Sequence, residues 1–519
     1  MKVAKAFVAV MLLFACDCCV FGTEGEYDIT KYGAIADGKT LCTDAIQKAI
    51  DACSDNGGGV VCLPAGRFIS GTIALRSGVT LNLLAGCTLL GSTDLKDYPP
   101  YVQAFRSYTD NYTDKSLIYA EKVEHIAITG RGVIDGQGAT FEGPYKVRPY
   151  MIRIIECNDV TVQDVKIINS PMWVQHYLAC EDVRIDGITV KSLVNHNNDG
   201  IDIDCCRRVT ISNCNILSGD DAIVLKSTAD PICRDVVVSN CVLSSRCNAL
   251  KMGTESNGGF QNIVLSNCAI YDTRLAGVAL EIVDGGIMDG VMVSNITMRN
   301  VGAPIFVRLG NRARPFKANM KKPTIGKLRN VTINNIEATG AGPTGCAISG
   351  LPGAFIENLT LNNLRLFFSG GGTKAEADRE VPEKANSYPE YSMFGRLPAY
   401  GLYCRHVRGL KLVNLQLGAD KNDSRHAVVF EDVESGTIEG LESTFTQGSR
   451  SILGFKNISN IIIRACRPPA GTDVFLQLEG PECKGIVLNS NDFAGVLNPV
   501  EYGEDVLKNK VILNSNHIK

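Results

Sequence analysis

Short runs of alternating apolar and polar residues recur along the chain, and each run ends at a polar residue, most often an asparagine. Three of them read ISNCNI, VSNCVL and LSNCAI, and their asparagines, Asn213, Asn240 and Asn267, follow one another at intervals of 27 residues. Such alternation predicts short β-strands, and a recurrence of roughly 20–30 residues predicts a solenoid in which each coil covers the next.

The intervals between the strands rarely hold an amphipathic helix, so the pattern predicts a right-handed parallel β-helix. Ile, Val and Leu would stack inside the coils, and the recurring asparagines would form a hydrogen-bonded ladder. Cys214, Cys241 and Cys268 would stack as small apolar side chains. One helix is expected over residues 43–53, which have an apolar stripe and would cap the N-terminal end of the solenoid. We therefore expect a single domain over residues 23–519.

Residues 1–22 have the pattern of a signal peptide, because two lysines precede an apolar run that is too short to span a membrane. Val20 and Gly22 fit cleavage after Gly22, whereas the sequence around Cys16 is a poor match to a lipoprotein signal. No later run has the ~20 apolar residues of a membrane span. A soluble protein in an extracytoplasmic space, secreted or periplasmic, is the expectation.

Composition narrows the possible partners and cofactors. Lys and Arg together number 52 and Asp and Glu 55, a net charge of −3, which argues against a general nucleic-acid binder. Without the three cysteines of the leader, 17 of the 20 remain, an odd number in a chain too long for a disulfide scaffold. Most should be buried thiols. Zinc-type spacings are missing, so we expect no metal. We also expect no other cofactor and a monomer.

Two segments, HNNDGIDIDCC and SGDDAIVLKS, hold the densest chemistry. If Ile203 and Leu225 occupy equivalent inward positions on successive coils, Asp199 lies ~4.8 Å from the Asp220–Asp221 pair. Three carboxyl groups would then converge. The same alternation points Asp202, Asp204 and Lys226 outward, toward solvent.

Carboxyl groups this close cannot all remain ionised, so at least one pKa should rise. A protonated carboxyl beside an ionised one suits glycoside cleavage, in which one donates to the leaving oxygen and the other activates water. A calcium site or an ordinary Asp-rich turn is the alternative that spacing alone leaves open.

At these motifs the sequence resembles glycoside hydrolase family 28, which contains polygalacturonases and rhamnogalacturonan hydrolases. The resemblance covers, in order, residues 27–40, 63–92, 133–138, 148–160, 169–176, 197–204 and 219–227. It implies a parallel β-helix and inversion at the anomeric carbon. It also implies that Asp220 is the general acid and that Asp199 and Asp221 position and deprotonate the water.

The chain departs from the polygalacturonase pattern at two motifs. Asn248 stands where a histidine of Gly-His-Gly would be, while Glu255 fits the Gly-Ser-Glu of exo-acting relatives. The Arg-Ile-Lys motif reads Ala279-Leu280-Glu281, so the two cations that hold a uronate in polygalacturonases are missing.

Stacking suggests a partial compensation for these cations. Lys251 would lie outward on the coil before Ala279, in a column with Asp202, and would supply a charge facing the substrate. Arg308 would stack beside Glu281, which either pairs with it or binds a sugar hydroxyl; a purely structural ion pair is an equal alternative.

Other candidates rest on less. Trp173 would stack on a sugar or pack in the core, and His176 would bind a substrate hydroxyl or serve a structural role. Lys226 would contact a uronate or neutralise Asp204. Two excursions from the repeat should lie over a face of the solenoid: the Arg-rich stretch at 308–322, with Arg312 and Arg314 near an acidic glycan or in solvent, and a longer insertion at 368–401, which should border a cleft.

Together these features predict a secreted, inverting glycoside hydrolase that cleaves α-glycosidic bonds of pectic glycans, galacturonan or rhamnogalacturonan, and acts from chain ends. Its partners would be acidic plant cell-wall glycans or oligosaccharides. One alternative is a polysaccharide lyase on the same scaffold, which would leave an unsaturated product. Another is a non-catalytic glycan-binding β-helix, against which the three retained aspartates argue.

Overall fold

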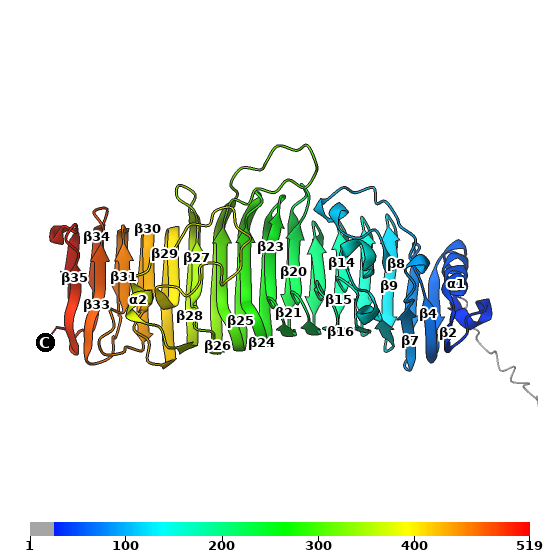
Figure 1. Ribbon diagram of the computed structural model, residues 1–519, viewed down its shortest axis with the longest axis horizontal. Coiled ribbons are helices and arrows are strands. Elements are labelled where there is room, and N and C mark those ends of the chain that lie inside the picture. Colours follow the sequence, from blue (N-terminus) through cyan, green and yellow to red (C-terminus); the bar gives the residue numbers. More distant parts are fainter. Residues whose placement is uncertain (1–24, 519) are drawn as a thin grey trace, which may run out of the picture.

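The structure, a computed structural model, describes residues 25–518, so the expected signal peptide lies outside the described residues. The chain winds into a right-handed parallel β-helix whose strands hydrogen-bond to the equivalent strands of the coils before and after. Figure 1 shows the solenoid from the side, with its N-terminal end at the right and its C-terminal end at the left. The predicted fold class is confirmed.

Each coil contributes strands to three parallel stacks, and the longer strands turn a corner from one stack into the next. The first stack contains β5 (Ile73–Ala74), β8 (Ser116–Glu121), β11 (Tyr150–Ile155), β14 (Gln175–Leu178), β17 (Ile201–Asp204), β20 (Ile223–Ser227), β23 (Leu250–Ser256), β27 (Cys346–Ser349), β31 (Leu453–Lys456), β33 (Thr472–Glu479) and β35 (Val496–Tyr502). The second contains β2 (Asp37–Leu41), β4 (Gly66–Ser70), β7 (Cys87–Gly91), β10 (Val133–Asp135), β13 (Lys166–Ile168), β16 (Thr189–Ser192), β19 (Asn215–Ser218) and β22 (Val242–Ser245). The third contains β1 (Glu26–Asp28), β3 (Gly59–Leu63), β6 (Val79–Leu83), β9 (Glu124–Gly130), β12 (Asn158–Gln163), β15 (Glu181–Asp186), β18 (Arg207–Ser212), β21 (Cys233–Ser239), β32 (Ser459–Arg464), β34 (Lys484–Asn489) and β36 (Val511–Asn514). The strands that span more than one stack are β24 (Phe260–Ile282), β25 (Ile287–Leu309), β26 (Lys327–Ala341), β28 (Ile356–Gly370), β29 (Ala399–Lys421) and β30 (His426–Ser443).

Helices are few in the described part of the chain. Helix α1 (Thr43–Asp55) lies over the N-terminal end and buries Ala45, Ile46, Ala49, Ile50 and Cys53, as its apolar stripe predicted. The short α2 (Lys374–Ala377) was not predicted and begins at a capping box formed by Thr373 and Glu376. Neither is long and apolar enough to cross a membrane, which holds for every helix among residues 25–518. Short 3-10 helices are η1 (Ile29–Tyr32), η2 (Leu95–Asp97), η3 (Tyr108–Asn111), η4 (Gly138–Thr140), η5 (Tyr145–Val147) and η6 (Lys508–Lys510).

The interior is a continuous column of stacked aliphatic side chains. Ile203 lies directly beside Leu225 in register, as the sequence predicted, and both are buried. The 17 cysteines of the described chain are all free thiols, and all are buried except the partly exposed Cys247. Cys214, Cys241 and Cys268 follow one another in the stack and each donates to a backbone carbonyl of its own turn. Burial therefore explains the cysteine content without disulfides.

The predicted asparagine ladder is present along one corner of the solenoid. The side-chain amide of Asn295 donates to Asn267 at 3.0 Å, Asn335 to Asn295 at 2.9 Å, Asn363 to Asn335 at 2.8 Å and Asn414 to Asn363 at 2.9 Å. All five have positive φ angles between 53° and 56°. Asparagine suits this corner because it tolerates the left-handed conformation and hydrogen-bonds to both neighbouring coils.

Three long loops lie over the outward face of the first stack and interrupt the regular coil surface. They comprise residues 92–115, residues 310–326 (the 310–326 loop) and residues 371–398 (the 371–398 insertion). Their coverage makes one sequence prediction wrong: Asp202 and Asp204 point outward from the coil, yet both are fully buried. Strand alternation sets only the direction of a side chain, whereas these loops decide whether solvent reaches it.

The ladder generates a stability prediction at Asn335, an exposed position that both accepts and donates a ladder hydrogen bond. Replacing it with Ala removes both bonds and forces a Cβ-bearing residue without a local hydrogen bond into the left-handed region. We expect a loss of about 2 kcal/mol. Asn335→Gly removes the bonds but keeps the conformation accessible, and should cost about 1 kcal/mol. Urea unfolding followed by circular dichroism measures both; equal losses would show that the backbone conformation contributes nothing.

Candidate active site

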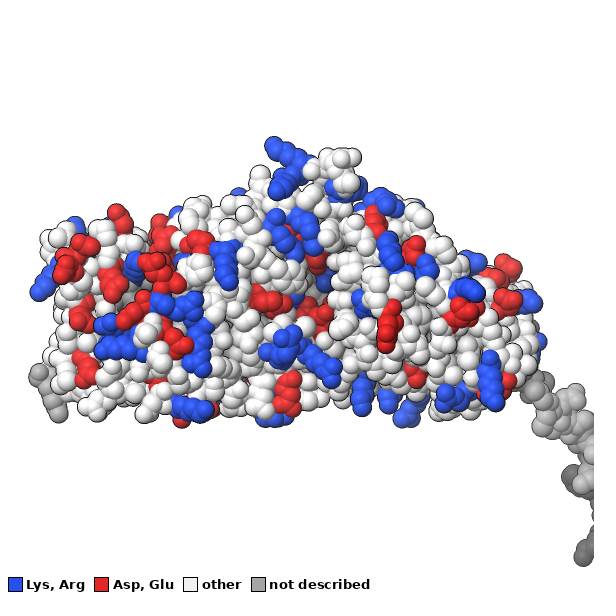
Figure 2. All heavy atoms as spheres, viewed as in Figure 1, with Lys and Arg blue, Asp and Glu red and all other residues white. Residues whose placement is uncertain are grey.

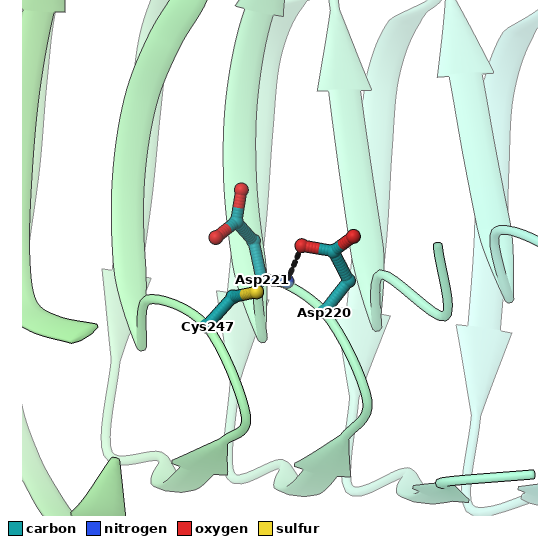
Figure 3. A group of neighbouring side chains, drawn as sticks. All are labelled: Asp220, Asp221 and Cys247. Atoms are coloured by element: carbon teal, nitrogen blue, oxygen red, sulfur yellow. Dashed lines mark hydrogen bonds between the residues drawn. The ribbon is translucent and has the colours of Figure 1, made fainter. Parts of the chain in front are cut away.

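The turns that precede β17, β20 and β23 bring the predicted acidic residues together. The backbone N–H of Gly200 donates to the carbonyl of Asp221 at 2.9 Å, and that of Ala222 donates to Asn248 at 2.9 Å. These bonds stack the turns of Asp199, Asp221 and Asn248 on successive coils. Carboxylate oxygens of Asp220 and Asp221 approach within 4.8 Å of one another, and Figure 3 shows the two groups side by side above Cys247. The turn of Asp199 thus lies on the coil beside the Asp220–Asp221 pair.

Two buried lysines hold this acidic cluster together. The ammonium nitrogen of Lys251 lies 3.1 Å from an Asp221 oxygen. That of Lys226 lies 3.6 Å from Asp202 and 3.9 Å from Asp199. The predicted contact of Lys226 with Asp204 is not formed, because Asp204 accepts from the backbone and hydroxyl of Thr228 and contacts His176.

The environment drives the pKa values of the adjacent pair apart. Burial and the charge of Asp221 raise the pKa of Asp220 above its usual range. Burial also acts on Asp221, but Lys251, Lys226 and the hydrogen bonds from Asn248 outweigh it and hold its pKa below the usual range. The side-chain amide of Asn248 donates to Asp221 at 2.8 Å and its backbone N–H does so at 3.0 Å. The environment thus favours the protonated form at Asp220 and the ionised form at Asp221.

Asp199 and Asp202 form the second part of the cluster. Burial raises the pKa of both well above the usual range; Asp220 and Asp202 add to the rise at Asp199, while Lys226 opposes it at both sites. One oxygen of Asp199 and both of Asp202 lack a hydrogen-bond partner within the described structure. The ammonium group of Lys226 is the charge that faces these two carboxyl groups.

The predicted ion pair between Glu281 and Arg308 is wrong, although the two residues do lie side by side in register. Arg308 instead donates to Ser349 and to the backbone carbonyls of Gly350 and Glu383, the last from the 371–398 insertion. Glu281 has no exposed surface and no hydrogen-bond partner for either oxygen, and Lys251 is 4.0 Å away. Burial raises its pKa well above the usual range despite Lys251.

The 371–398 insertion closes the cluster on this side, which sequence reasoning did not resolve to residues. The hydroxyl of Tyr388 lies 3.5 Å from the Lys251 nitrogen, and a Glu390 oxygen lies 3.9 Å from it. Burial raises the pKa of Glu390 to about 7, with Lys251 opposing the rise and Asp221 adding to it. Lys251 is consequently surrounded by three carboxyl groups and is only 3% exposed.

Glu255 lies under the 310–326 loop. Its oxygens contact Lys226 at 3.4 Å, Arg314 at 2.5 Å and Arg312 at 3.9 Å. Burial acts to raise the pKa of Glu255, but these three cations hold it well below the usual range. Arg312 also forms an ion pair with Asp284. The two loop arginines thus neutralise acidic side chains of the coils rather than extending into solvent.

Trp173 and His176 lie on the outer side of the coils but are buried instead of facing an open surface. Trp173 is 4% exposed and makes edge contacts with Tyr112, Tyr150 and His176, while the Lys226 nitrogen lies 4.6 Å from its ring centre. His176 is fully buried, and burial lowers its pKa to about 4, so it is neutral at pH 7. With no exposed atom, His176 cannot contact a substrate hydroxyl in this conformation; the structural alternative holds.

A groove of about 780 Å³ opens beside the half-buried Asp220. Its lining includes Asn195, His196, Asn197, Asp220, Arg246, Cys247 and Arg274. Sequence reasoning missed the two exposed arginines: Arg246 directly follows β22, Arg274 lies within β24, and neither belongs to a motif. Figure 2 shows acidic and basic side chains close together over the middle of the solenoid.

Asp220, Asp221 and Cys247 are the group of described residues that could offer three ligand atoms to a metal ion. Burial and the neighbouring aspartates raise the pKa of the Cys247 thiol well above its usual range, and the pKa of Asp220 is raised as well. A metal ligand must be deprotonated, and both shifts favour the protonated form of the donor, which opposes metal binding. We assign no metal to this cluster.

Comparison with known proteins places these features in a family. The profile of "Glycosyl hydrolases family 28" matches residues 53–386. A "Probable polygalacturonase" of Vitis vinifera is 34% identical over 219 residues, 39% of this chain and 44% of that protein. An "Exo-poly-alpha-D-galacturonosidase" of Dickeya chrysanthemi is 45% identical over 119 residues, 21% of this chain and 19% of that protein. The matches therefore span less than half the length of either relative.

A solved structure supports the fold over a longer stretch. The exopolygalacturonase of Thermotoga maritima superposes with a TM-score of 0.58 at 26% identity, covering 66% of this chain and 87% of that one.

The cation at Lys251 generates a prediction about stability and pH. Lys251→Met leaves Asp221 buried beside other carboxyl groups without its closest cation, so its pKa should rise and the fold should lose about 3–5 kcal/mol at pH 7. In the natural protein, the depressed pKa of Asp221 stabilises the fold at pH values above the pKa that Asp221 has in the unfolded chain. This stabilisation is lost as the pH falls through the lower pKa of the folded protein. In the variant the raised pKa reverses the sign, because folding then favours protonation.

We therefore expect the deficit of Lys251→Met to shrink between pH 7 and pH 4, as measured by urea unfolding at both values. Lys411→Met, at an exposed lysine of β29 on the third stack, is the matched control and should change stability little at either pH. A deficit that does not depend on pH would contradict the assigned interaction with Asp221.

Proposed function

The chain belongs to family 28 of the glycosyl hydrolases, and from this premise we propose that it hydrolyses α-glycosidic bonds of pectic polysaccharides or oligosaccharides. The observation that carries the proposal is the adjacent pair of Asp220, with a raised pKa, and the buried Asp221, with a lowered one; of the two, Asp220 lines an open groove. Such a pair supplies an acid and a base at the same pH.

In the proposed reaction, protonated Asp220 donates its proton to the glycosidic oxygen as the bond to the anomeric carbon breaks. Ionised Asp221, held by Lys251 and Asn248, accepts a proton from the water whose oxygen bonds to that carbon. Asp199, on the preceding coil, holds the water from the other side. Each bond formed and broken is thus matched by one proton transfer, and water is the only co-reactant.

Action from chain ends is supported by the loops over the first stack. The 310–326 loop and the 371–398 insertion contact side chains of the cluster from opposite directions, at Glu255 and at Lys251. A cleft obstructed in this way suits a chain terminus better than the middle of a polymer. The relative from Dickeya chrysanthemi carries an exo-acting name.

Acidic glycans are the proposed substrate class. Lys251 does not face solvent and is occupied by three carboxyl groups, so it is poorly placed to replace the missing family cations. Arg246 and Arg274 are exposed in the groove beside Asp220 and offer guanidinium groups to uronate carboxylates instead. Export to an extracytoplasmic space, where plant cell-wall glycans are encountered, fits the expected signal peptide.

Asp220→Asn tests the acid. It should lower kcat on a panel of pectic oligosaccharides by about 100-fold or more, because the amide cannot donate the proton. Asp272→Asn, at an exposed aspartate paired with Arg299, is the matched control and should retain full activity. Products are separated by chromatography and their ultraviolet absorbance is recorded. Unsaturated products would replace the proposal with the lyase alternative, and turnover undiminished in Asp220→Asn would remove the assigned acid.

The stereochemistry of the reaction is a separate prediction. The family implies inversion, whereas a separation within 4.8 Å is shorter than the ~6.5–9.5 Å usual for inverting enzymes. We predict inversion because Asp199 and Asp221 can hold a water between successive coils without direct attack by a carboxylate. Proton NMR during the first minutes of hydrolysis of an α-linked substrate should show the β-anomer first. An α-anomer appearing first would assign Asp221 as a nucleophile.

A further inference from the structure

A second pocket lies farther along the same outward face, toward the C-terminal end of the solenoid, beside residues 377–383 of the 371–398 insertion. It has a volume of about 570 Å³, within the range of sites for small molecules. One wall is the segment from α2 to Glu383, and the floor is formed by β29, β30, β31 and β33. Arg450 of the coils donates to Asp378 of the insertion at 2.7 Å and ties this wall to the solenoid.

The floor consists of two columns of outward side chains in register. One column runs Tyr403, Val429, Gly454 and Gln477, and its small central members leave the hollow. A Cβ at Gly454 would lie 2.8 Å from the imidazole of His426, so a side chain here cannot be accommodated without displacing that ring. The glycine keeps the centre of the floor bare.

The second column alternates in charge: Arg405, Glu431, Lys456 and Glu479. Its members do not neutralise one another by ion pairs in the described structure. Arg405 pairs with Glu383 of the insertion, and Glu431 accepts from the Tyr403 hydroxyl at 2.6 Å. Lys456 is exposed and has no ion-pair partner among residues 25–518.

Several polar atoms of the lining are also left without a hydrogen bond. They are the Nε of Arg405, one oxygen of Glu383 and the side-chain oxygen of Gln477. Arg405 is 1% exposed, so its guanidinium has no access to bulk water. The guanidinium donates instead to the backbone carbonyls of Val381 at 2.6 Å and Pro382 at 3.2 Å, so it fixes the wall of the pocket. The side chains that a ligand can reach are the exposed Lys456 and the partly exposed Gln477 and Glu431.

We propose that this pocket is a second, non-catalytic saccharide-binding site. Its accessible side chains include a donor, on Lys456, acceptors, on Glu431 and Glu479, and the amide group of Gln477, in one small volume. A ligand must therefore both accept and donate hydrogen bonds over short distances, as the hydroxyl groups of a sugar ring do. The choice of a uronate-containing saccharide rests on the proposed function, since the same glycan would supply both sites.

The pocket is separate from the candidate active site. Four register steps lead from Lys251 through Ala279, Phe306 and Ala347 to Tyr403, a distance of ~19 Å at ~4.8 Å per coil. The outward face between them is covered by Phe394 and Leu397 of the insertion, which pack on Phe306 and Ala347. A ligand in this pocket cannot reach Asp220 along the groove surface, so it would hold the glycan rather than extend the catalytic cleft.

The test uses the full chain carrying Asp220→Asn, so that a bound oligosaccharide is not cleaved. Trigalacturonic acid is the probe, with neutral galactotriose and tartrate as comparison ligands. Hydrogen–deuterium exchange should show protection of residues 374–383 and 453–457 in addition to the groove at 195–197. Adding Lys456→Ala with Gln477→Ala should weaken binding at the pocket about 10-fold and leave protection of the groove unchanged. Lys411→Ala is the control for loss of an exposed lysine.

Each outcome decides between two statements. Hydrolysis by the natural protein without protection at 374–383 would overturn the second site and leave the proposed function intact. Protection at 374–383 in a protein that hydrolyses no pectic substrate would support the second site and overturn the proposed function. Equal protection by tartrate would show an anion site and overturn the saccharide assignment. Should the double variant fail to fold, Lys456→Ala alone carries the test, because that side chain is exposed.

Discussion

The backbone hydrogen bonds between successive coils are the interaction on which the rest of the molecule depends. They fix equivalent residues of neighbouring coils at a spacing of ~4.8 Å, independently of what their side chains carry. Inward positions use this spacing to stack aliphatic groups. Outward positions are held at the same spacing even where they are acidic, so the scaffold stabilises a cluster that would otherwise separate. Asp199, Asp221 and Asn248 are neighbours for this reason and not because they attract one another.

Holding carboxyl groups this close in a buried setting costs free energy. The lysines offset this cost with an opposite charge, and protonation offsets it by removing a negative charge. Lys251 and Asn248 act on Asp221 and lower its pKa, while burial and the charge of Asp221 raise the pKa of Asp220. The asymmetry arises one coil away, because Asn248 and Lys251 both lie on the coil after the pair and on the side of Asp221. A single additional coil therefore converts two neighbouring aspartates into groups with opposite roles.

The sequence was sufficient for everything that the repeat determines. The inward partners Ile203 and Leu225, the stacking of Lys251 before Ala279 and the ladder at Asn335 all follow from strand alternation and a constant interval. It failed where residues outside the repeat decide the outcome. Asp202 is buried by loops, and Arg308 turns to the insertion instead of to Glu281, because a loop conformation is set by tertiary contacts that have no period in the sequence. Tyr388 and Glu390 were unpredictable for the same reason.

Because of the 371–398 insertion, polar hollows form at only some positions along the outward face of the solenoid. A regular coil can present only a shallow ridge of side chains, since every outward column continues into the next coil without a wall. The insertion packs Phe394 and Leu397, near its C-terminal end, with Phe306 and Ala347, where the outward column is itself apolar, and this contact anchors it. Its preceding segments form walls over polar columns, Tyr388 and Glu390 near Lys251, and Asp378 to Glu383 near Arg405. One loop anchored by hydrophobic contact thus creates two separate polar hollows, and a substitution that loosens the anchor at Phe306 acts on both.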